Sequence, residues 1–145
     1  MKRAGRIHWL TITSTIATLA VVGILFMGKE TPEQACQRFL VALAKQDVPA
    51  LTDLTYMEDA KPEEISAAWK KTVTVSAPYF RFAWKFKRSS QPEPNRASVD
   101  LSWVKNADSP SAYEENYGIP MEKVDGRWKV DVRAITADFY PGLPR

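Results

Sequence analysis

The segment YFRFAWKFK, residues 79–87, decides how the rest of the chain is interpreted. Its aromatic side chains recur at every second position and alternate with small or basic ones. Because successive side chains of a strand point to opposite faces, this period of two predicts a half-buried β-strand. The residues expected to face the core are Phe80, Phe82, Trp84 and Phe86.

Three further strands are predicted after this one. Apolar residues alternate with polar ones over 97–103, 117–124 and 127–133, which is the pattern of strands buried on one face. Polar segments at 89–96 and 106–111 are expected to be loops. The dipeptide Asp125-Gly126 favours the positive φ angles of a two-residue hairpin turn, so the last two strands should pair directly.

Before residue 72 the apolar residues recur with a helical period instead. Helices are predicted over residues 31–46, 47–54 and 62–71. The first has a strong start, because Thr31 can cap it, Pro32 suits the first turn and Gln34 completes a capping box. The second begins at Asp47-Val48-Pro49, which breaks the first.

Helices followed by a meander of strands predict an α+β fold, in which the helices pack on a curved four-stranded antiparallel sheet. TPEQA at 31–35, followed by Phe39-Leu40, and EKVDGRWKV at 122–130 resemble the nuclear transport factor 2-like superfamily, especially its small bacterial membrane-anchored domains of unknown function. The resemblance covers about residues 31–133 and concerns structural motifs, not catalytic ones. It implies a sheet that wraps a long helix and leaves a cone-shaped cavity at one end.

The N-terminal residues have the composition of a membrane anchor. No charged side chain occurs from 7 to 27, and a helix of that length reaches about 31 Å, which matches the hydrocarbon core of a bilayer. Lys2, Arg3 and Arg6 precede this segment, which places the N-terminus in the cytoplasm by the positive-inside rule. The alternative is a cleaved signal peptide, but the segment is long for one and no A-x-A-like site follows Phe26.

These patterns divide the chain into four parts. Residues 1–6 are expected to be a cytoplasmic tail, 7–28 a transmembrane helix, 29–133 an extracytoplasmic cone-type domain and 134–145 a C-terminal tail. The expected location is the bacterial inner membrane, crossed once, with the domain in the periplasm or outside the cell.

One face of the predicted span is a candidate interface. Thr13, Ala17 and Ala20 share that face, and small residues allow a helix of another membrane subunit to approach closely. The other interpretation is that hydroxyl and small residues are simply tolerated in a single span, where hydroxyls bond back to their own helix.

The charges exclude one class of partner. The net charge of +3 comes from the tail, because residues 29–145 hold 17 basic and 17 acidic side chains. A neutral domain is not expected to bind nucleic acid.

Few residues here suit a metal, a cofactor or a disulfide. The only histidine, His8, lies at the predicted membrane boundary and makes no metal site alone. Cys36 is the only cysteine, so an intrachain disulfide is excluded, and its place beside the apolar face of the first helix predicts a packing role. No cofactor or metal is expected.

Catalysis is not expected either. Some members of the superfamily are isomerases or dehydratases, whose cones hold a carboxylate base beside groups such as tyrosine. Here Asp100 would have to be the base, with Tyr79 or Tyr117 nearby. Strand alternation turns Asp100 away from Val99 and Leu101 and toward solvent, whereas general acid–base catalysis needs shielded groups with shifted pKa values.

Two aromatic features have more than one interpretation. The aromatic strand face at 80–86 either lines a ligand cavity or is simply core. Phe139 and Tyr140 in the C-terminal tail need cover, which requires the tail to fold back on the sheet or to dock onto a neighbouring protein.

The strand also carries basic side chains at Arg81, Lys85, Lys87 and Arg88. They suit an acidic partner or anionic headgroups. The plainer interpretation is a solvated strand face, which the neutral total favours.

Three functional hypotheses follow. The favoured one is a non-catalytic accessory or scaffold subunit, whose span packs within a larger membrane complex and whose domain makes protein contacts outside. The second is a membrane-tethered binder of a small apolar ligand or lipid in the cone. The third, an isomerase-like enzyme, is disfavoured because residues 29–145 contain no histidine.

Overall fold

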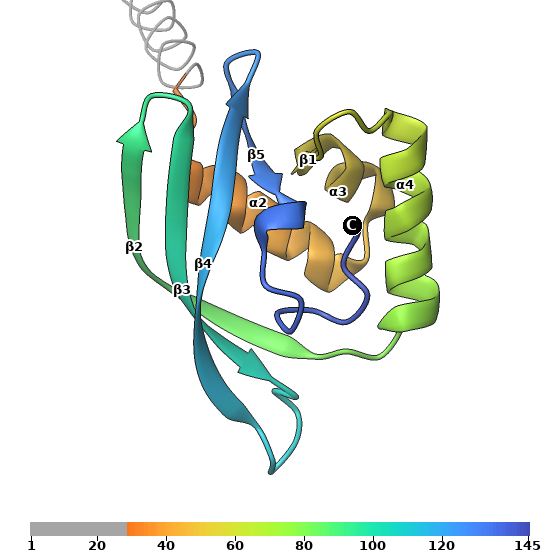
Figure 1. Cartoon of the computed structure of the whole chain (residues 1–145). Helices are drawn as coiled ribbons and strands as arrows, with labels where there is room; N and C mark the ends of the chain where they lie inside the picture. Colours follow the sequence, from red (N-terminus) through yellow and green to blue (C-terminus); the bar gives the residue numbers. More distant parts are fainter. Residues whose placement is uncertain (1–28) are drawn as a thin grey trace, which may run out of the picture. The chain divides into compact units, whose positions relative to one another are not determined.

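A computed structural model describes residues 29–145, in which helices pack against a sheet, as the predicted α+β class requires (Figure 1). The predicted tail, the span at 7–28 with its candidate interface, and His8 lie outside the described residues. Within residues 29–145, no helix has the length and apolar character needed to cross a membrane. The helices are α2 (Pro32–Lys45), α3 (Val48–Leu54) and α4 (Pro62–Lys71), and a π-helical turn, η1 (Thr72–Ser76), follows α4.

The sheet has five strands in the order β1-β5-β4-β3-β2. They are β1 (Thr55–Tyr56), β2 (Phe82–Glu93), β3 (Arg96–Lys105), β4 (Tyr113–Val124) and β5 (Arg127–Asp131). The predicted four-stranded antiparallel sheet is corrected in one respect, because β1 pairs in parallel with β5 and makes the sheet mixed. A strand of two residues is too short to show an alternating pattern, so the sequence did not reveal it.

The strand ends also differ from the prediction. The loop expected at 89–96 is wrong, because β2 and β3 continue through it and turn only at Pro94-Asn95. Side chains there are mostly exposed on both faces, so the apolar alternation that identifies a strand is missing. β4 begins at Tyr113 instead of 117, and β5 ends at Asp131, before the short 3-10 turn η2 (Val132–Ala134).

The helix starts follow the predicted pattern. The amide of Gln34 donates to Oγ1 of Thr31 at 3.2 Å, and the amide of Thr31 donates to Oε1 of Gln34 at 3.0 Å. α2 ends at Gln46 in the left-handed conformation, and Oδ1 of Asp47 then accepts from the amide of Ala50 at 3.1 Å to cap α3. Local capping therefore positions both helices where the sequence indicated.

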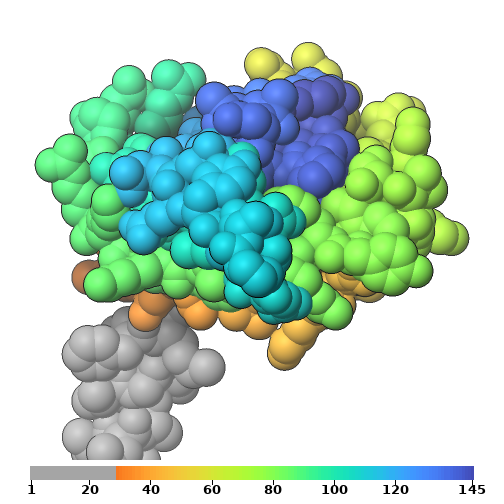
Figure 2. Space-filling model, turned by 90° about the horizontal axis from the view of Figure 1, so that it is seen from below, coloured from red at the N-terminus to blue at the C-terminus, as the bar shows by residue number. Residues whose placement is uncertain are grey.

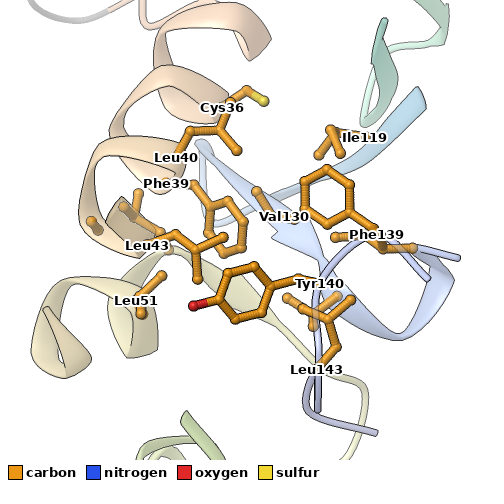
Figure 3. Packing of buried hydrophobic residues seen from close by; sticks show 14 of the residues in the cluster. Cys36, Phe39, Leu40, Leu43, Leu51, Ile119, Val130, Phe139, Tyr140 and Leu143 are labelled. Carbon is orange, nitrogen blue, oxygen red and sulfur yellow. The ribbon is translucent and has the colours of Figure 1, made fainter. Parts of the chain in front are cut away.

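The core centres on the buried face of α2 (Figure 3). Phe39, Leu40 and Leu43 of α2 gather there with Val130 of β5 in one cluster of buried residues. Trp69 of α4 joins the cluster, with its ring edge-on to Phe39 at 5.7 Å between centroids. A single core therefore connects the helices to the sheet.

The C-terminal residues fold back into the same core. Phe139 and Tyr140 are fully buried, and Leu143 is nearly so. Nη1 of Arg145 donates to the backbone oxygens of Arg133 at 2.9 Å and Ile135 at 3.0 Å. Of the two arrangements considered for this tail, folding back is the one observed, so residues 134–145 belong to the compact unit of residues 31–145.

Gly142 holds this segment against η1. Its φ is +67°, an angle that side chains with a Cβ rarely adopt. Its carbonyl oxygen accepts a hydrogen bond from Oγ1 of Thr72. A Cβ at position 142 would overlap with Cβ and Oγ of Ser76, so both the backbone angle and the available space require glycine.

We predict that Gly142→Ala lowers the free energy of unfolding by about 2–4 kcal/mol, because it adds steric overlap to backbone strain. Gly126→Ala is the matched control, since Gly126 has a φ of +78° but nothing within 4 Å of a Cβ. It should cost only about 1 kcal/mol. Urea unfolding of the two variants measures the difference, and equal losses would contradict close packing of residue 142 on η1.

Candidate functional site

The inner face of the sheet, which faces the helices, is the first candidate site. On β3, Val99, Leu101 and Trp103 are fully buried. The four aromatic residues considered as a cavity lining are partly buried and pack against the core; they are Phe80, Phe82, Trp84 and Phe86. The predicted alternation is therefore confirmed, and the aromatic face looks into the domain.

Aromatic rings fill this interior. Trp103 stacks on Phe82 with centroids 4.4 Å apart, and the ring of Phe139 lies 4.1 Å from that of Trp103. Tyr140 meets Phe80 edge-on at 5.0 Å. Seen from below, C-terminal residues occupy the space between the strands and α4 (Figure 2). The chain's own C-terminal segment thus packs on the aromatic inner face of the sheet, and Phe139 and Tyr140, considered as partner contacts, are inside the domain.

One polar atom in this interior lacks a partner. Nε1 of Trp103 is the only buried side-chain nitrogen or oxygen within the described residues that makes no hydrogen bond. Leaving a buried donor unpaired costs about 1–3 kcal/mol, so such groups are uncommon. The indole marks a point at which an acceptor from another molecule would be stabilised.

A polar cluster lies on the inner face where β3 ends and β4 begins. Nζ of Lys105 is 2.7 Å from Oε2 of Glu115 and donates to the hydroxyl of Tyr117 at 3.0 Å. The Tyr117 hydroxyl donates to Glu115 at 2.6 Å, and Oδ2 of Asp138 lies 3.3 Å from it. This cluster links the two strands to the C-terminal segment.

The charges of this cluster stabilise one another. Burial alone would lower the pKa of Lys105, whose side chain is 11% exposed, but hydrogen bonds with Glu115 and Tyr117 outweigh burial and raise it. The bond from Lys105 lowers the pKa of Glu115, whereas burial raises the pKa of Tyr117. At neutral pH Lys105 is an ammonium, Glu115 is a carboxylate and Tyr117 is an uncharged phenol. Each pKa is shifted away from 7, so none of the three groups readily exchanges a proton at that pH.

Lys105 and Glu115 were missed by sequence reasoning. Lys105 continues the inward alternation of Leu101 and Trp103, so a lysine at an expected core position was the available signal. Its partner Glu115 could not be identified, because the early start of β4 was not predicted.

The three residues considered for catalysis are not brought together. Asp100 pairs in register with Gly118, whereas Tyr117 pairs with Leu101 on the opposite face of the sheet. Oδ2 of Asp100 lies 3.2 Å from Nε of Arg88 in an ion pair on the outer face. Tyr79 is 87% exposed, far from shielded. The expectation that Asp100 faces outward is confirmed.

The outer face of β2 carries the predicted basic side chains. Arg81 lies 3.7 Å from Asp108, and Arg88 pairs with Asp100. Lys87 donates to Oδ1 of Asn116, and Lys85 is exposed and makes no ion pair with another described residue. Beside them, Arg88, Asp100 and Gly118 border a hollow of about 430 Å³ on the outer face.

Cys36 is a packing residue, as predicted. It is fully buried on α2, and burial, with a smaller contribution from the charge of Glu33, raises the pKa of its thiol to about 12. A thiol with that pKa is not a nucleophile at neutral pH. Residues 29–145 also contain no group of three or more side chains placed to hold a metal ion.

Comparison with known proteins identifies the fold but no activity. No protein-family model and no curated protein matches the chain. Among solved structures, one from Thiobacillus denitrificans, described as a candidate calcium/calmodulin-dependent protein kinase type II association domain, is 13% identical with a TM-score of 0.51, over 69% of this chain and 89% of that one.

Two further structures are similar. One is a nuclear transport factor 2-like protein of unknown function from Shewanella oneidensis, 18% identical with a TM-score of 0.48, over 67% of this chain and 88% of that one. The other, a ketosteroid isomerase-like protein from Erwinia carotovora atroseptica, is 16% identical with a TM-score of 0.45, over 68% and 86%. Likeness at this level concerns the fold alone, and the described domain shares its fold with the Thiobacillus denitrificans structure.

Proposed function

We propose that the chain is a non-catalytic, single-pass membrane protein that serves as an accessory subunit of a larger membrane complex. In this proposal residues 7–28 span the bacterial inner membrane, the N-terminus is cytoplasmic and the domain contacts other proteins in the periplasm or outside the cell. The uncharged segment at 7–27 and the basic residues before it support this arrangement.

The observation that carries the proposal is the filled interior. Phe139 and Tyr140 occupy the space beside Trp103 and Phe82, where a substrate or ligand of a cone-shaped domain would otherwise lie. A domain whose interior is occupied by its own side chains offers other molecules mainly its outer surface. Contacts with proteins are the role that suits such a domain best.

The polar groups support a non-catalytic role as well. Asp100 is ion-paired on the outer face, away from Tyr117. Lys105 and Glu115 neutralise each other, and their pKa values are shifted away from neutrality. A general acid or base would need a pKa moved toward the working pH.

The proposed topology predicts the outcome of reporter fusions. Alkaline phosphatase fused after Arg145 should be active, because it forms its disulfides only in an oxidising compartment, while green fluorescent protein exported through the same route should stay dark. The opposite pattern, a bright fluorescent fusion with an inactive phosphatase, would place the domain in the cytoplasm.

The accessory role predicts stable partners. When membranes of the producing cell are extracted in mild detergent and a C-terminally tagged chain is captured, other membrane subunits should co-purify in stoichiometric amounts. Replacing Thr13, Ala17 and Ala20 together with leucine should abolish this association, since bulky residues prevent close helix approach. Quantitative mass spectrometry of the captured material is the measurement.

A matched control changes the other side of the same predicted helix. Thr11, Thr15 and Val22 fall roughly opposite that face at helical spacing, so their replacement with leucine should leave the association intact. Capture of the wild-type chain without any partner would contradict the accessory role. Equal loss in both variants would remove the interface from the proposal.

One observation favours a second candidate, a tethered binder of a small apolar ligand. The buried N–H of Trp103 has no acceptor among the described residues, and a carbonyl-bearing apolar molecule would supply one. Such a ligand would have to displace Phe139, which contacts the same ring.

The two candidates differ in what the purified chain carries. The accessory role predicts that solvent extraction of the purified full chain, followed by mass spectrometry, recovers no stoichiometric small molecule beyond bulk membrane lipid. A compound recovered from wild type, enriched by Phe139→Ala and lost in Trp103→Phe, would establish the second candidate instead, because the first change opens space and the other removes the donor.

A further inference from the structure

The edge strand β2 is the feature that the described domain leaves incomplete. It forms one edge of the sheet, the other being the two-residue β1, and β3 pairs with one side of it only. A strand at a sheet edge turns every second N–H and C=O away from its neighbour, so these groups remain free to pair with another extended chain. Over residues 82–86 the pairing with β3 is regular, and the first irregularity falls between Phe86 and Arg88.

The aromatic side chains of β2 are also incompletely covered. The inward side chains Leu101 and Trp103 of β3 are fully buried, whereas Trp84 and Phe86 of β2 are only partly buried. Nε1 of Trp84 donates to Gln37 of α2 at 3.1 Å, which leaves the ring at the margin of the core. An added strand would cover the exposed part of these rings.

Basic side chains on the outer face of β2 favour an acidic partner. Lys85 is exposed and, like Lys87, makes no ion pair within the described residues. Residues 1–28 contain no acidic side chain that could neutralise them. A strand lying beside β2 would place its outward side chains next to these ammonium groups, where carboxylates are stabilised and cations are repelled.

We propose that β2, over residues 82–87, binds an extended acidic segment of a partner protein as an additional strand of the sheet. The segment would alternate acidic residues, which face Lys85 and Lys87, with apolar residues, which cover Trp84 and Phe86. This inference rests on the proposed function, because it names the surface and the chemistry of one protein contact.

A second copy of this chain fits the same edge poorly. Two β2 strands paired edge to edge would bring Lys85 and Lys87 of one copy close to those of the other, and like charges on adjacent strands are destabilising. Lysines on edge strands commonly prevent self-association for this reason. The same lysines that reject a second copy attract an acidic strand, so charge distinguishes the two occupants.

The probes are fluorescein-labelled peptides of about seven residues that alternate Glu with Val, Leu or Phe, a length that matches a typical strand. Fluorescence anisotropy is measured with the full chain in detergent. At least one peptide should bind, more weakly at high salt because exposed charges are screened. Hydrogen exchange with mass spectrometry should show new protection confined to the peptide that contains residues 82–87.

Charge variants supply the controls. Lys85→Glu with Lys87→Glu should weaken binding about tenfold or more and should favour peptides that carry Lys in place of Glu. Lys70→Glu with Lys71→Glu, exposed at the end of α4, should leave the affinity unchanged within about twofold.

Several results would overturn the assignment. They are absence of binding by every peptide, protection elsewhere, unchanged affinity in the Lys85 and Lys87 variant, or a dimer with β2 protected in the absence of peptide. A chain that captures membrane subunits but fails this test would keep the accessory role and lose only the β2 site. A chain captured alone would remove the accessory role whatever the peptides do.

Discussion

The contact of Phe139 with Trp103 is the interaction on which the rest of the structure depends. Trp103 lies on β3 and stacks on Phe82 of the edge strand β2, while Phe139 comes from the C-terminal segment. Replacing one such buried ring with alanine typically costs about 3–5 kcal/mol, a large share of the stability of a small domain. Through this contact the last residues of the chain become part of the core.

Closing the interior changes which residues can act on other molecules. The polar groups on the inner face, Lys105, Glu115 and Tyr117, satisfy one another. Asp100, the carboxylate considered as a catalytic base, is on the outer face and paired with Arg88. The pairing raises the pKa of Lys105 and lowers that of Glu115, and both shifts lead away from the neutral range that acid–base catalysis needs. Under the proposed function, the outer surface and the sheet edge are the parts of the domain available for contacts with other proteins.

Features encoded by a few neighbouring residues could be predicted from the sequence. The capping box at Thr31 and the turn at Asp125-Gly126 depend on local geometry, and both occur as expected. β1 was missed because it has two residues and pairs with a distant partner, Val130 for Thr55. The far end of the β2–β3 hairpin was missed because its side chains are exposed on both faces and show no apolar alternation. The same holds for the candidate site. Strand alternation was enough to predict that Asp100 faces outward, whereas the position of the C-terminal tail depends on contacts between residues far apart in the chain.

The alternation that identified the first strand also explains why its surface is unfinished. A neighbouring strand on each side adds cover to the aromatic side chains of a strand, and β2 has a neighbour on one side only. The C-terminal segment covers Phe80 and Phe82 through Tyr140, but no contact of Tyr140 with the ring of Trp84 is found. Burial of apolar area is worth about 25 cal/mol per Å², so a partner that completes this edge gains from the exposed part of each ring. Only a segment whose own charges are compatible with Lys85 and Lys87 can bind there and obtain this burial free energy.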